Sequence, residues 1–526
     1  MIRPILTVSF GTLASRLLGF ARDALVAALF GAGPVADAFL VAFQGVNVVR
    51  RMLTEGALNA ALVPAYLRIQ DDDGTAAATV FAGRVLGSVS LAMAVAATLI
   101  GLAMPLVIAL MAPGFIGHPT QQLAVDNARL MLPYLAFAGP VAVMMGLLNA
   151  RHRFAFAAFS PVLFNIALIC VMIVLLAWPQ DAIHAAQAMA VAVGITGLLQ
   201  LLMLGMRVGG EKLAAPLRVS FDAEMRVFFL KGLAGMLANS GPQLLIVAAA
   251  IIASSTPSAV SWLYFANRLI ELPLGIVGAA MGTVLVPEVA RAIGGNNRAA
   301  LVHAESRGLE LAVGLALPAA LGLIVLSRPI VETLFEHGAF NAADTAATAS
   351  ALAVLALGLP AHVLVKALAP AFFARGDTTT PLLATLKGFA VALVLAIVLS
   401  RMVGASGIAA AIAFGAWSNA LTLIRRGAAT FGFSIDSAAR RRLPRIALAA
   451  LGMCGLLWLN AAFVGPLAES MHGLALMAIV GVLIVCGIAV YGMLLTLFGA
   501  INWADAVTAV RGPPARDLRI QGPHGK

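Results

Sequence analysis

Charged side chains occur inside long apolar stretches of this chain, where each is costly unless it faces protein or water. They are Arg16, Arg22, Asp23, Asp37, Arg50, Arg51, Glu55, Arg268 and Glu271. Guanidinium groups bind phosphates and carboxylates through paired hydrogen bonds. Because the arginines outnumber the carboxylates, this group predicts a cationic site for a phosphate or carboxylate ligand.

The spacing of these residues separates the arginines into two kinds. Three have a nearby carboxylate: Arg22 with Asp23, Arg51 with Glu55, and Arg268 with Glu271. Such pairs can serve structure alone. Arg16 shares a helix face with Asp23, but neither Arg16 nor Arg50 has a carboxylate at pairing distance along its own helix. Arg16 and Arg50 are therefore the strongest candidates for substrate contact, whereas Lys366 is a weaker one because lysines near helix ends usually reach to the interface.

The composition identifies the class of protein that must position these residues. The 526 residues are 61% hydrophobic and 11% charged, against roughly 45 to 50% and about 25% in ordinary globular chains. The mean hydropathy is +0.99. A soluble protein is excluded, and so is a membrane β-barrel, because apolar runs such as 91–108 are continuous rather than alternating. We therefore predict an all-α polytopic membrane protein.

Apolar runs bounded by glycine, proline and charged residues predict about 14 transmembrane helices. They lie near 5–30, 35–67, 80–112, 123–149, 156–178, 184–207, 224–254, 258–290, 304–327, 345–374, 381–400, 405–426, 443–464 and 473–500. Basic residues gather in alternate loops, which predicts that both termini are cytoplasmic. This placement of the +11 net charge favours lipid headgroups and argues against a nucleic-acid partner.

A weak internal repeat suggests how these helices are organised. Val63-Pro64 recurs as Val286-Pro287, and Ala150-Arg151 recurs as Ala374-Arg375 at nearly the same offset. The repeat predicts two six-helix lobes around a central cavity, plus two C-terminal helices. The predicted parts are an N-lobe at 1–207, an inner loop at 208–223, a C-lobe at 224–427, helices 13 and 14 at 428–500, and a cytoplasmic tail at 501–526.

Several longer motifs connect these charged residues with a known family. They are Ser15-Arg16-Leu17-Leu18-Gly19-Phe20-Ala21-Arg22-Asp23, Phe30-Gly31-Ala32-Gly33, Ala36-Asp37-Ala38-Phe39, Asn47 through Arg50-Arg51 to Glu55-Gly56-Ala57, Ser261-Trp262 through Arg268 to Pro273, and Lys366-Ala367-Leu368-Ala369-Pro370. Over nearly the whole chain, the sequence resembles the MurJ (MviN) flippases of the bacterial cytoplasmic membrane. The resemblance implies the multidrug/oligosaccharidyl-lipid/polysaccharide exporter fold, with helices 13 and 14 forming a groove for a polyprenyl tail.

The resemblance also implies roles for individual residues. The positions that match the family's substrate-binding arginines are Arg16, Arg22, Arg50 and Arg268, and those that match supporting or gating residues are Asp23, Asp37, Arg51, Glu55 and Glu271. Two positions depart from the family pattern. Val46 stands where proline is usual, which affects a bend of the helix, and Asn267 stands where aspartate is frequent, which makes the site less acidic.

The expected function is transport of lipid II, the lipid-linked peptidoglycan precursor, to the outer leaflet by alternating access. No bond is broken, so neither a catalytic residue nor a metal or cofactor is expected. The expected partners are lipid II and membrane lipids, and the cell-wall synthesis machinery is a further candidate. Two alternatives remain: an exporter of small molecules with the same fold, and an enzyme acting on polyprenyl phosphates that would use the carboxylates Asp71 to Asp73 with magnesium.

Overall fold

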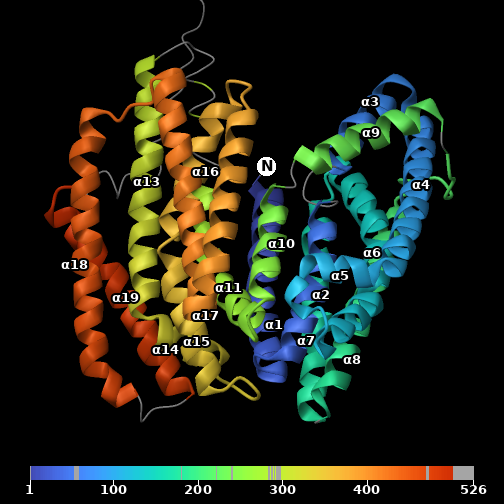
Figure 1. Ribbon diagram of the computed structural model, residues 1–526. Helices are drawn as coiled ribbons and strands as arrows, with labels where there is room; N and C mark the ends of the chain where they lie inside the picture. The colour runs from blue at the N-terminus through green and yellow to red at the C-terminus, as the bar shows by residue number, and fades with distance from the viewer. Residues whose placement is uncertain are drawn as a thin grey trace, which may run out of the picture. The chain divides into compact units, whose positions relative to one another are not determined.

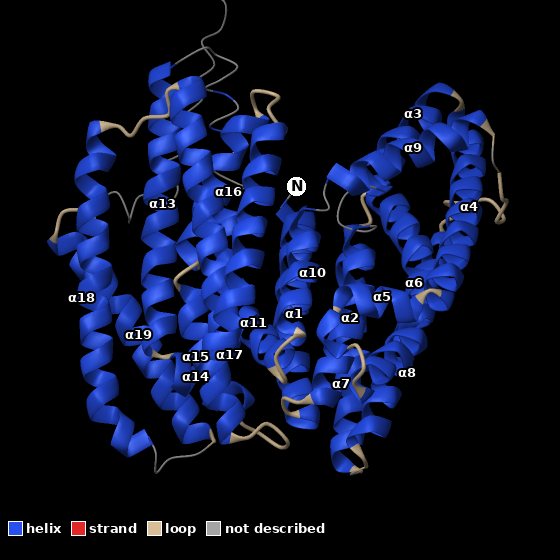
Figure 2. Ribbon diagram, viewed as in Figure 1, coloured by secondary structure: helices blue, strands red, loops and turns tan. Residues whose placement is uncertain are grey.

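The protein is described by a computed structural model that covers residues 2–52, 58–178, 180–220, 222–238, 241–281, 298–468 and 473–500, with the single positions 285, 288 and 291. Figure 2 shows that the regular structure in these residues is helical. The predicted all-α class is therefore confirmed. The expected tail at 501–526 and the candidate residue Glu55 lie outside the described residues.

The helices follow one another along the chain as Figure 1 shows. The earlier ones are α1 (Ile2–Phe30), α2 (Pro34–Met52), α3 (Leu58–Asp72), α4 (Gly74–Leu102), α5 (Met104–Met111), α6 (Pro119–Ala150), α7 (Phe154–Ala177), α8 (Ala182–Gly210), α9 (Ala223–Ala238) and α10 (Gly241–Ala253). The later ones are α11 (Ala259–Ala280), α13 (Arg298–Val325), α14 (Ser327–Phe335), α15 (Ala342–Ala356), α16 (Leu359–Phe373), α17 (Thr379–Phe431), α18 (Ser437–Ala468) and α19 (Leu474–Leu497).

Within the described residues, nine helical segments are long and apolar enough to cross a membrane. They come from α4, α6, α7, α8, α13, α15 with α16, α17, α18 and α19. Helices α1, α2 and α11 are not among the nine, and they carry most of the charged residues singled out above. The charged residues lower the hydropathy of these three helices below that of an ordinary membrane span. Such charges are tolerated in a membrane where they face protein rather than lipid.

Within the described residues, the predicted helix near 80–112 is divided into α4 and α5. The described parts of the stretch near 35–67 belong to α2 and α3, and those of the stretch near 224–254 belong to α9 and α10. The break between α4 and α5 falls at Ala103, just before Pro105, whose ring prevents a continuous helix. In α17 the expected division is confirmed, because Val403 and Gly404 have non-helical backbone angles and Gly404 has φ +58°.

The described chain divides into two compact units. Unit 1 contains residues Met1–Glu271, Arg328–Gly358 and Leu382–Asn419. In unit 1, α6 packs on α2, α4 and α8, and α1 packs on α7. A buried apolar cluster joins α3, α4, α6, α8 and α9, with Tyr66, Leu62 and Leu147 completely inaccessible. Unit 1 carries every described member of the charged group.

Unit 2 contains Leu272–Ser327, Leu359–Pro381 and Ala420–Lys526. Here α13 packs against α16, α18 and α19 (Figure 1). The hydroxyl of Tyr491 on α19 donates a hydrogen bond to the Gly314 carbonyl of α13, 2.7 Å away. Helix α18 begins at Ser437, earlier than predicted, so Arg440 to Arg442 belong to the helix rather than to the preceding loop.

Candidate functional site

The carboxylate of Asp23 is the centre of the charged group in unit 1. Asp23 lies in α1 and is 1% exposed. Its Oδ1 atom accepts hydrogen bonds from Arg22 Nη2 at 2.7 Å and from the Tyr264 hydroxyl at 3.1 Å. Its Oδ2 atom lies 2.6 Å from Arg268 Nε, an ion pair whose atoms are not aligned as a hydrogen bond. One buried carboxylate therefore holds two arginines from α1 and α11.

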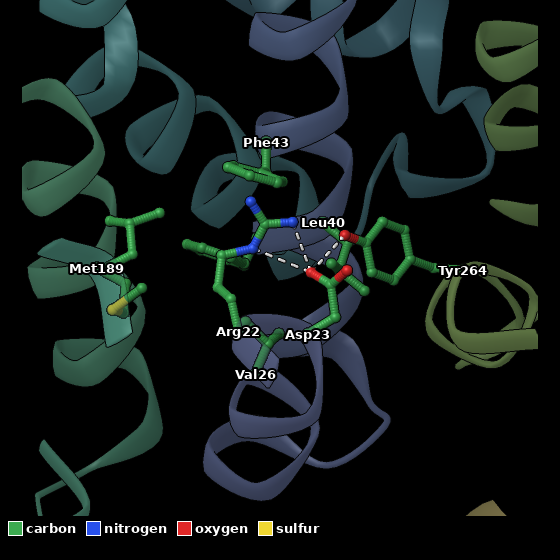
Figure 3. A pocket seen from close by; sticks show the side chains of 9 residues that line it. Arg22, Asp23, Val26, Leu40, Phe43, Met189 and Tyr264 are labelled. Carbon is green, nitrogen blue, oxygen red and sulfur yellow. Dashed lines mark hydrogen bonds and ion pairs between the residues drawn. The ribbon is translucent and has the colours of Figure 1, made fainter. Parts of the chain in front are cut away.

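Arg22 is fixed on several sides, as Figure 3 shows for part of its surroundings. Its guanidinium lies over the ring of Phe43, 5.0 Å from the ring centre, in the geometry of a cation–π contact. Its Nη1 atom donates to Asn165 Oδ1 of α7 at 3.1 Å. Asn165 in turn donates to the backbone carbonyls of Ser15 and Pro161. Arg22 is thus oriented by α2 and α7 as well as by Asp23.

Arg268 is shared between two carboxylates. Its Nη1 atom donates to Glu271 Oε2 at 2.8 Å, one turn along α11, which confirms the predicted pair. Asn267 also donates to Glu271, at 3.3 Å. The guanidinium approaches α1 at Gly19, where an added Cβ would lie 2.8 Å from Arg268 Nη2. The glycine of the first motif therefore leaves the space that this arginine occupies.

Asp37 forms a separate buried contact near the start of α2. It is 2% exposed, and its Oδ1 atom accepts from the Ser261 backbone N–H at 2.8 Å and from the Ser261 hydroxyl. Ser261 is in the first turn of α11, whose N–H groups have no partner within the helix. Asp37 thus satisfies the start of α11, a structural role for one of the predicted supporting acids.

Aromatic side chains close one side of the Asp23 cluster. Phe265, next to Tyr264 on α11, packs against Phe335 at 5.1 Å and Phe340 at 5.6 Å between ring centres. Phe335 also packs against Phe20 of α1. Phe265, Phe335 and Phe340 are at most 1% exposed. These rings form a buried cluster that reaches Tyr264, whose hydroxyl binds Asp23.

The other candidate residues lie farther from Asp23 or outside its contacts. Arg16 is exposed and makes no ion pair with any residue that the structure describes, so its predicted lack of a carboxylate is confirmed to that extent. Arg50 donates to Asn47 Oδ1 at 3.2 Å, and Arg51 is half-buried. Lys366 belongs to unit 2, where its ammonium lies 3.5 Å from the Leu274 carbonyl. The carboxylates 71–73 of the enzyme alternative are all exposed at the end of α3.

A small cavity adjoins the cluster. It has a volume of about 10 Å³ and is lined by Arg22, Asp23, Val26, Phe39, Leu40, Phe43, Leu168, Met189 and Tyr264 (Figure 3). A cavity of this size has room for about one water molecule, whereas pockets that enclose a small organic ligand usually have roughly 300 to 1,000 Å³. A phosphate group therefore fits beside Arg22 only if the side chains around it move.

Sequence reasoning missed three residues of this cluster. Tyr264, Asn165 and Gly19 touch or accommodate the arginines, but none is charged. Tyr264 precedes Arg268 by four residues, so it lies on the same helix face, a spacing that identifies it in retrospect. Asn165 is an amide within an apolar run, and the sequence has no feature that aims it at Arg22.

The electrostatic balance of the cluster defines its chemistry. Arg22 and Arg268 are offset by Asp23 and Glu271, so this part of the site is close to neutral. Arg16, Arg50 and Arg51 are further cationic side chains on the same two helices, α1 and α2. An anionic group that replaces Asp23 as the hydrogen-bond acceptor can therefore bind two guanidinium groups in fixed positions.

Comparison with known proteins identifies a family that matches most of the chain. The family model described as "Lipid II flippase MurJ" matches residues 26–477. A protein of Rhizobium tropici named "Probable lipid II flippase MurJ" is 34% identical over 510 residues, 95% of each chain. One of the same name from Rhizobium meliloti is 37% identical and covers 87% of this chain and 86% of its own.

Solved structures share the fold. A structure described as "Lipid II flippase MurJ, inward closed conformation" has a TM-score of 0.77 and 22% identity, and covers 95% of this chain and all of its own. An inward-facing multidrug resistance MATE family transporter of the MOP superfamily has a TM-score of 0.62 and 16% identity over 84% of this chain and 98% of its own. At these identities the likeness concerns the fold alone.

Proposed function

This chain belongs to the MurJ family of lipid II flippases, and from that premise we propose that it carries lipid II from the inner to the outer leaflet of the bacterial cytoplasmic membrane. The reaction is a movement between leaflets rather than a chemical conversion. In it, Arg16, Arg22, Arg50 and Arg268 bind the diphosphate and the acidic headgroup. Asp23, Asp37, Arg51, Glu55 and Glu271 support or gate the site.

The main observation behind this proposal is that one carboxylate, that of Asp23, contacts two arginines. Arg22 and Arg268 both contact Asp23, and their guanidinium groups come from helices distant in sequence. A diphosphate offers the same kind of acceptor oxygens with more charge, so it can compete with Asp23 for both groups. Its binding then changes how α1 and α11 are joined, which couples the ligand to a movement of helices.

The arginines lie at different depths along their helices. Arg22 lies eight residues before the end of α1 at Phe30, and Arg16 lies six residues further from that end, or about 12 and 21 Å at 1.5 Å per residue. Arg50 lies near the opposite end of α2 from Pro34, the residue at which α2 begins after the turn 31–33. A headgroup passing along α1 therefore meets Arg22 and Arg16 in turn, whereas Arg50 lies about as far from the turn 31–33 along α2 as Arg16 does along α1. This order supports a path rather than a single deep binding pocket.

The remaining parts of the proposal concern the whole molecule. Two lobes at 1–207 and 224–427, joined by residues 208–223, rock about a central cavity, while residues 428–500 hold the polyprenyl tail. Both termini are cytoplasmic, because the basic loops alternate along the chain. The cell-wall synthesis machinery is the expected neighbour, since it consumes lipid II at the outer surface.

The decisive experiment depletes this protein in its native cell and quantifies lipid II in each leaflet. Accumulation in the inner leaflet with loss from the outer leaflet, restored by the wild type, supports flipping. Arg16→Glu should fail to restore it, because this exposed arginine has no ion-pair partner among the described residues and its reversal leaves the fold intact. Arg401→Glu, which reverses an exposed arginine outside the group, is the matched control and should restore it.

Unchanged lipid II in both leaflets, with accumulation of a drug or another lipid-linked sugar, would overturn the substrate and favour an exporter of the same fold. Equal membrane levels of both variants are required and are measured in the same samples. Restoration by a protein in which Arg16, Arg50 and Arg268 are all reversed would overturn the assigned site. Magnesium-dependent product formation by the purified protein would favour the enzyme alternative.

A further inference from the structure

The connection between α8 and α9 is bound to the side of α4 by its own backbone. Residues 213–220, here termed the strap, run along α4 in an extended course. The Ala215 N–H donates to the Thr79 carbonyl at 2.9 Å, and the Arg218 N–H donates to the Gly83 carbonyl at 3.3 Å. Backbone hydrogen bonds between a loop and a helix side are unusual, because most helix carbonyls have partners in their own helix.

A serine closes the end of this contact. The Ser88 hydroxyl of α4 donates to the Ser220 carbonyl at 3.0 Å and accepts from the Ser220 N–H at 3.0 Å. Ser88 is 1% exposed, so these bonds are sheltered from water. A sheltered pair of this kind is costly to break unless both groups find new partners.

Two glycines of α4 make the space for the strap. A Cβ added at Gly83 would lie 2.7 Å from the Ala215 carbonyl oxygen, and one added at Gly87 would lie 2.5 Å from that of Arg218. The obstructing atoms belong to the backbone of the strap rather than to flexible side chains. Gly83 and Gly87 are four residues apart, so they form one groove on the helix surface.

Both ends of the strap are anchored in unit 1. Leu213 at its start and Met225 and Phe228 in α9 belong to the buried cluster with α3, α4, α6 and α8. Asp222 pairs with Arg84 of α4 at 2.6 Å and accepts from the Met225 N–H at the start of α9. That backbone bond, together with the Ser220 hydroxyl and Arg84, lowers the pKa of Asp222, so this anchor stays ionised at neutral pH.

We propose that the strap is a splint that fixes α9 to α4. Helix α9 then moves with the N-lobe at 1–207, although its residues fall within the range 224–427 assigned to the C-lobe, and the joint between the two lobes lies after α9 and not in the linker 208–223. This inference rests on the proposed function in one respect, because it concerns which part moves during alternating access. A hinge needs residues free to change their backbone angles. In the strap, the N–H groups of Ala215, Arg218 and Ser220 are instead bonded to α4. Helix α9 is packed on α3 and lies in the same core as α4.

The first test joins the strap to α4 through a disulfide bond. Ser88→Cys with Ser220→Cys is introduced after the native Cys170, Cys454 and Cys486 are replaced by alanine, and the purified full chain is reconstituted in lipid vesicles. A mild oxidant should join the two positions in high yield, measured by mass spectrometry of the intervening peptides. Transfer of a labelled lipid II analogue should then proceed at the rate of the reduced protein.

Two outcomes of this test overturn the splint. Failure of the cysteines to cross-link would mean that the strap does not rest on α4. A cross-linked protein that loses transfer, and regains it when a reductant is added, would show that the linker must move. If the reduced protein and the wild type both transfer no lipid II, the proposed function fails, whereas the cross-linking yield still tests the docking of the strap.

The second test lifts the strap. Gly87→Ala puts a methyl group against the strap backbone, so we expect faster hydrogen exchange at the Ala215 and Arg218 amides and a lower transfer rate. Gly101→Ala of the same helix is the matched control, because its methyl group meets only the end of the flexible Leu132 side chain, and it should change neither quantity. Faster exchange with full transfer would overturn the splint, and so would unchanged exchange.

Discussion

Asp23 Oδ2 lies 2.6 Å from Arg268 Nε, which joins the C-terminal third of α1 to the middle of α11 through a carboxylate that is 1% exposed. The same carboxylate also holds Arg22. Since a buried charge is stable only when it is paired, the three side chains depend on one another. The cluster therefore joins α1 to α11. It is also a site at which an anionic ligand can replace Asp23 as the partner of Arg22 and Arg268.

Neutralising the central carboxylate should destabilise the protein. Asp23→Asn leaves Arg22 and Arg268 without their shared counter-ion, and breaking a buried pair of this kind costs about 3 to 5 kcal/mol. We expect a lower unfolding temperature in detergent and loss of growth support. Asp23→Glu retains the charge and should lose less stability. Equal unfolding temperatures for the asparagine variant and the wild type would contradict the role of Asp23 as the joint.

A side chain at position 19 should slow lipid II transfer without lowering the stability of the protein. Gly19→Ala displaces the end of the Arg268 side chain, which is flexible and can move without opening the helices. We therefore expect normal membrane levels and an unfolding temperature close to that of the wild type, but slower lipid II transfer. Gly205→Ala, whose methyl group meets Met144 at an ordinary distance of 3.7 Å, is the control. Full transfer by Gly19→Ala would show that the position of Arg268 is not critical.

We expect Asp37 to stabilise the protein through its hydrogen bonds to Ser261 rather than through its negative charge. Asp37→Ala leaves the buried Ser261 N–H without a partner, at a cost of about 1 to 3 kcal/mol. Asp37→Asn keeps an acceptor oxygen in nearly the same place and should retain most of the stability. Denaturation of the two variants in parallel measures the difference. If asparagine were as damaging as alanine, the negative charge rather than the hydrogen bond would be what matters.

Asp436 should stabilise the start of α18 over a wide pH range. Its Oδ1 atom accepts from the Ala439 N–H at 2.6 Å, and this bond, aided by His303, lowers the pKa of the carboxyl. A lowered pKa means that the stabilisation is complete at neutral pH and is lost only in acid, below about pH 4. Asp436→Ala should cost about 0.5 to 2 kcal/mol, and Asp436→Asn only part of that. Thermal unfolding between pH 8 and 5 should show the wild type to be more stable than the alanine variant throughout this range.

Local sequence predicted the helices well where one physical cause dominated. Helices α6, α7 and α19 follow their apolar runs closely, and Gly404 marks the break in α17 because its positive φ suits glycine. The stretch near 80–112 was harder to divide, because its hydropathy continues through Ala103 and only Pro105 signals the turn. The early start of α18 depends on Asp436, whose capping contact is local but lies outside the apolar run.

Hydropathy and spacing along a helix are local properties, so the sequence alone predicts the membrane class and the arginine-rich character of α1 and α2. It also predicts the short-range pairs of Arg22 with Asp23 and of Arg268 with Glu271. The folded structure shows in addition that the same Asp23 carboxylate binds Arg268 of α11, and that Asn165 orients Arg22. The same holds for the strap on α4. These contacts join side chains and backbone from distant helices, and helix packing, which brings such segments together, leaves no fixed spacing in the sequence.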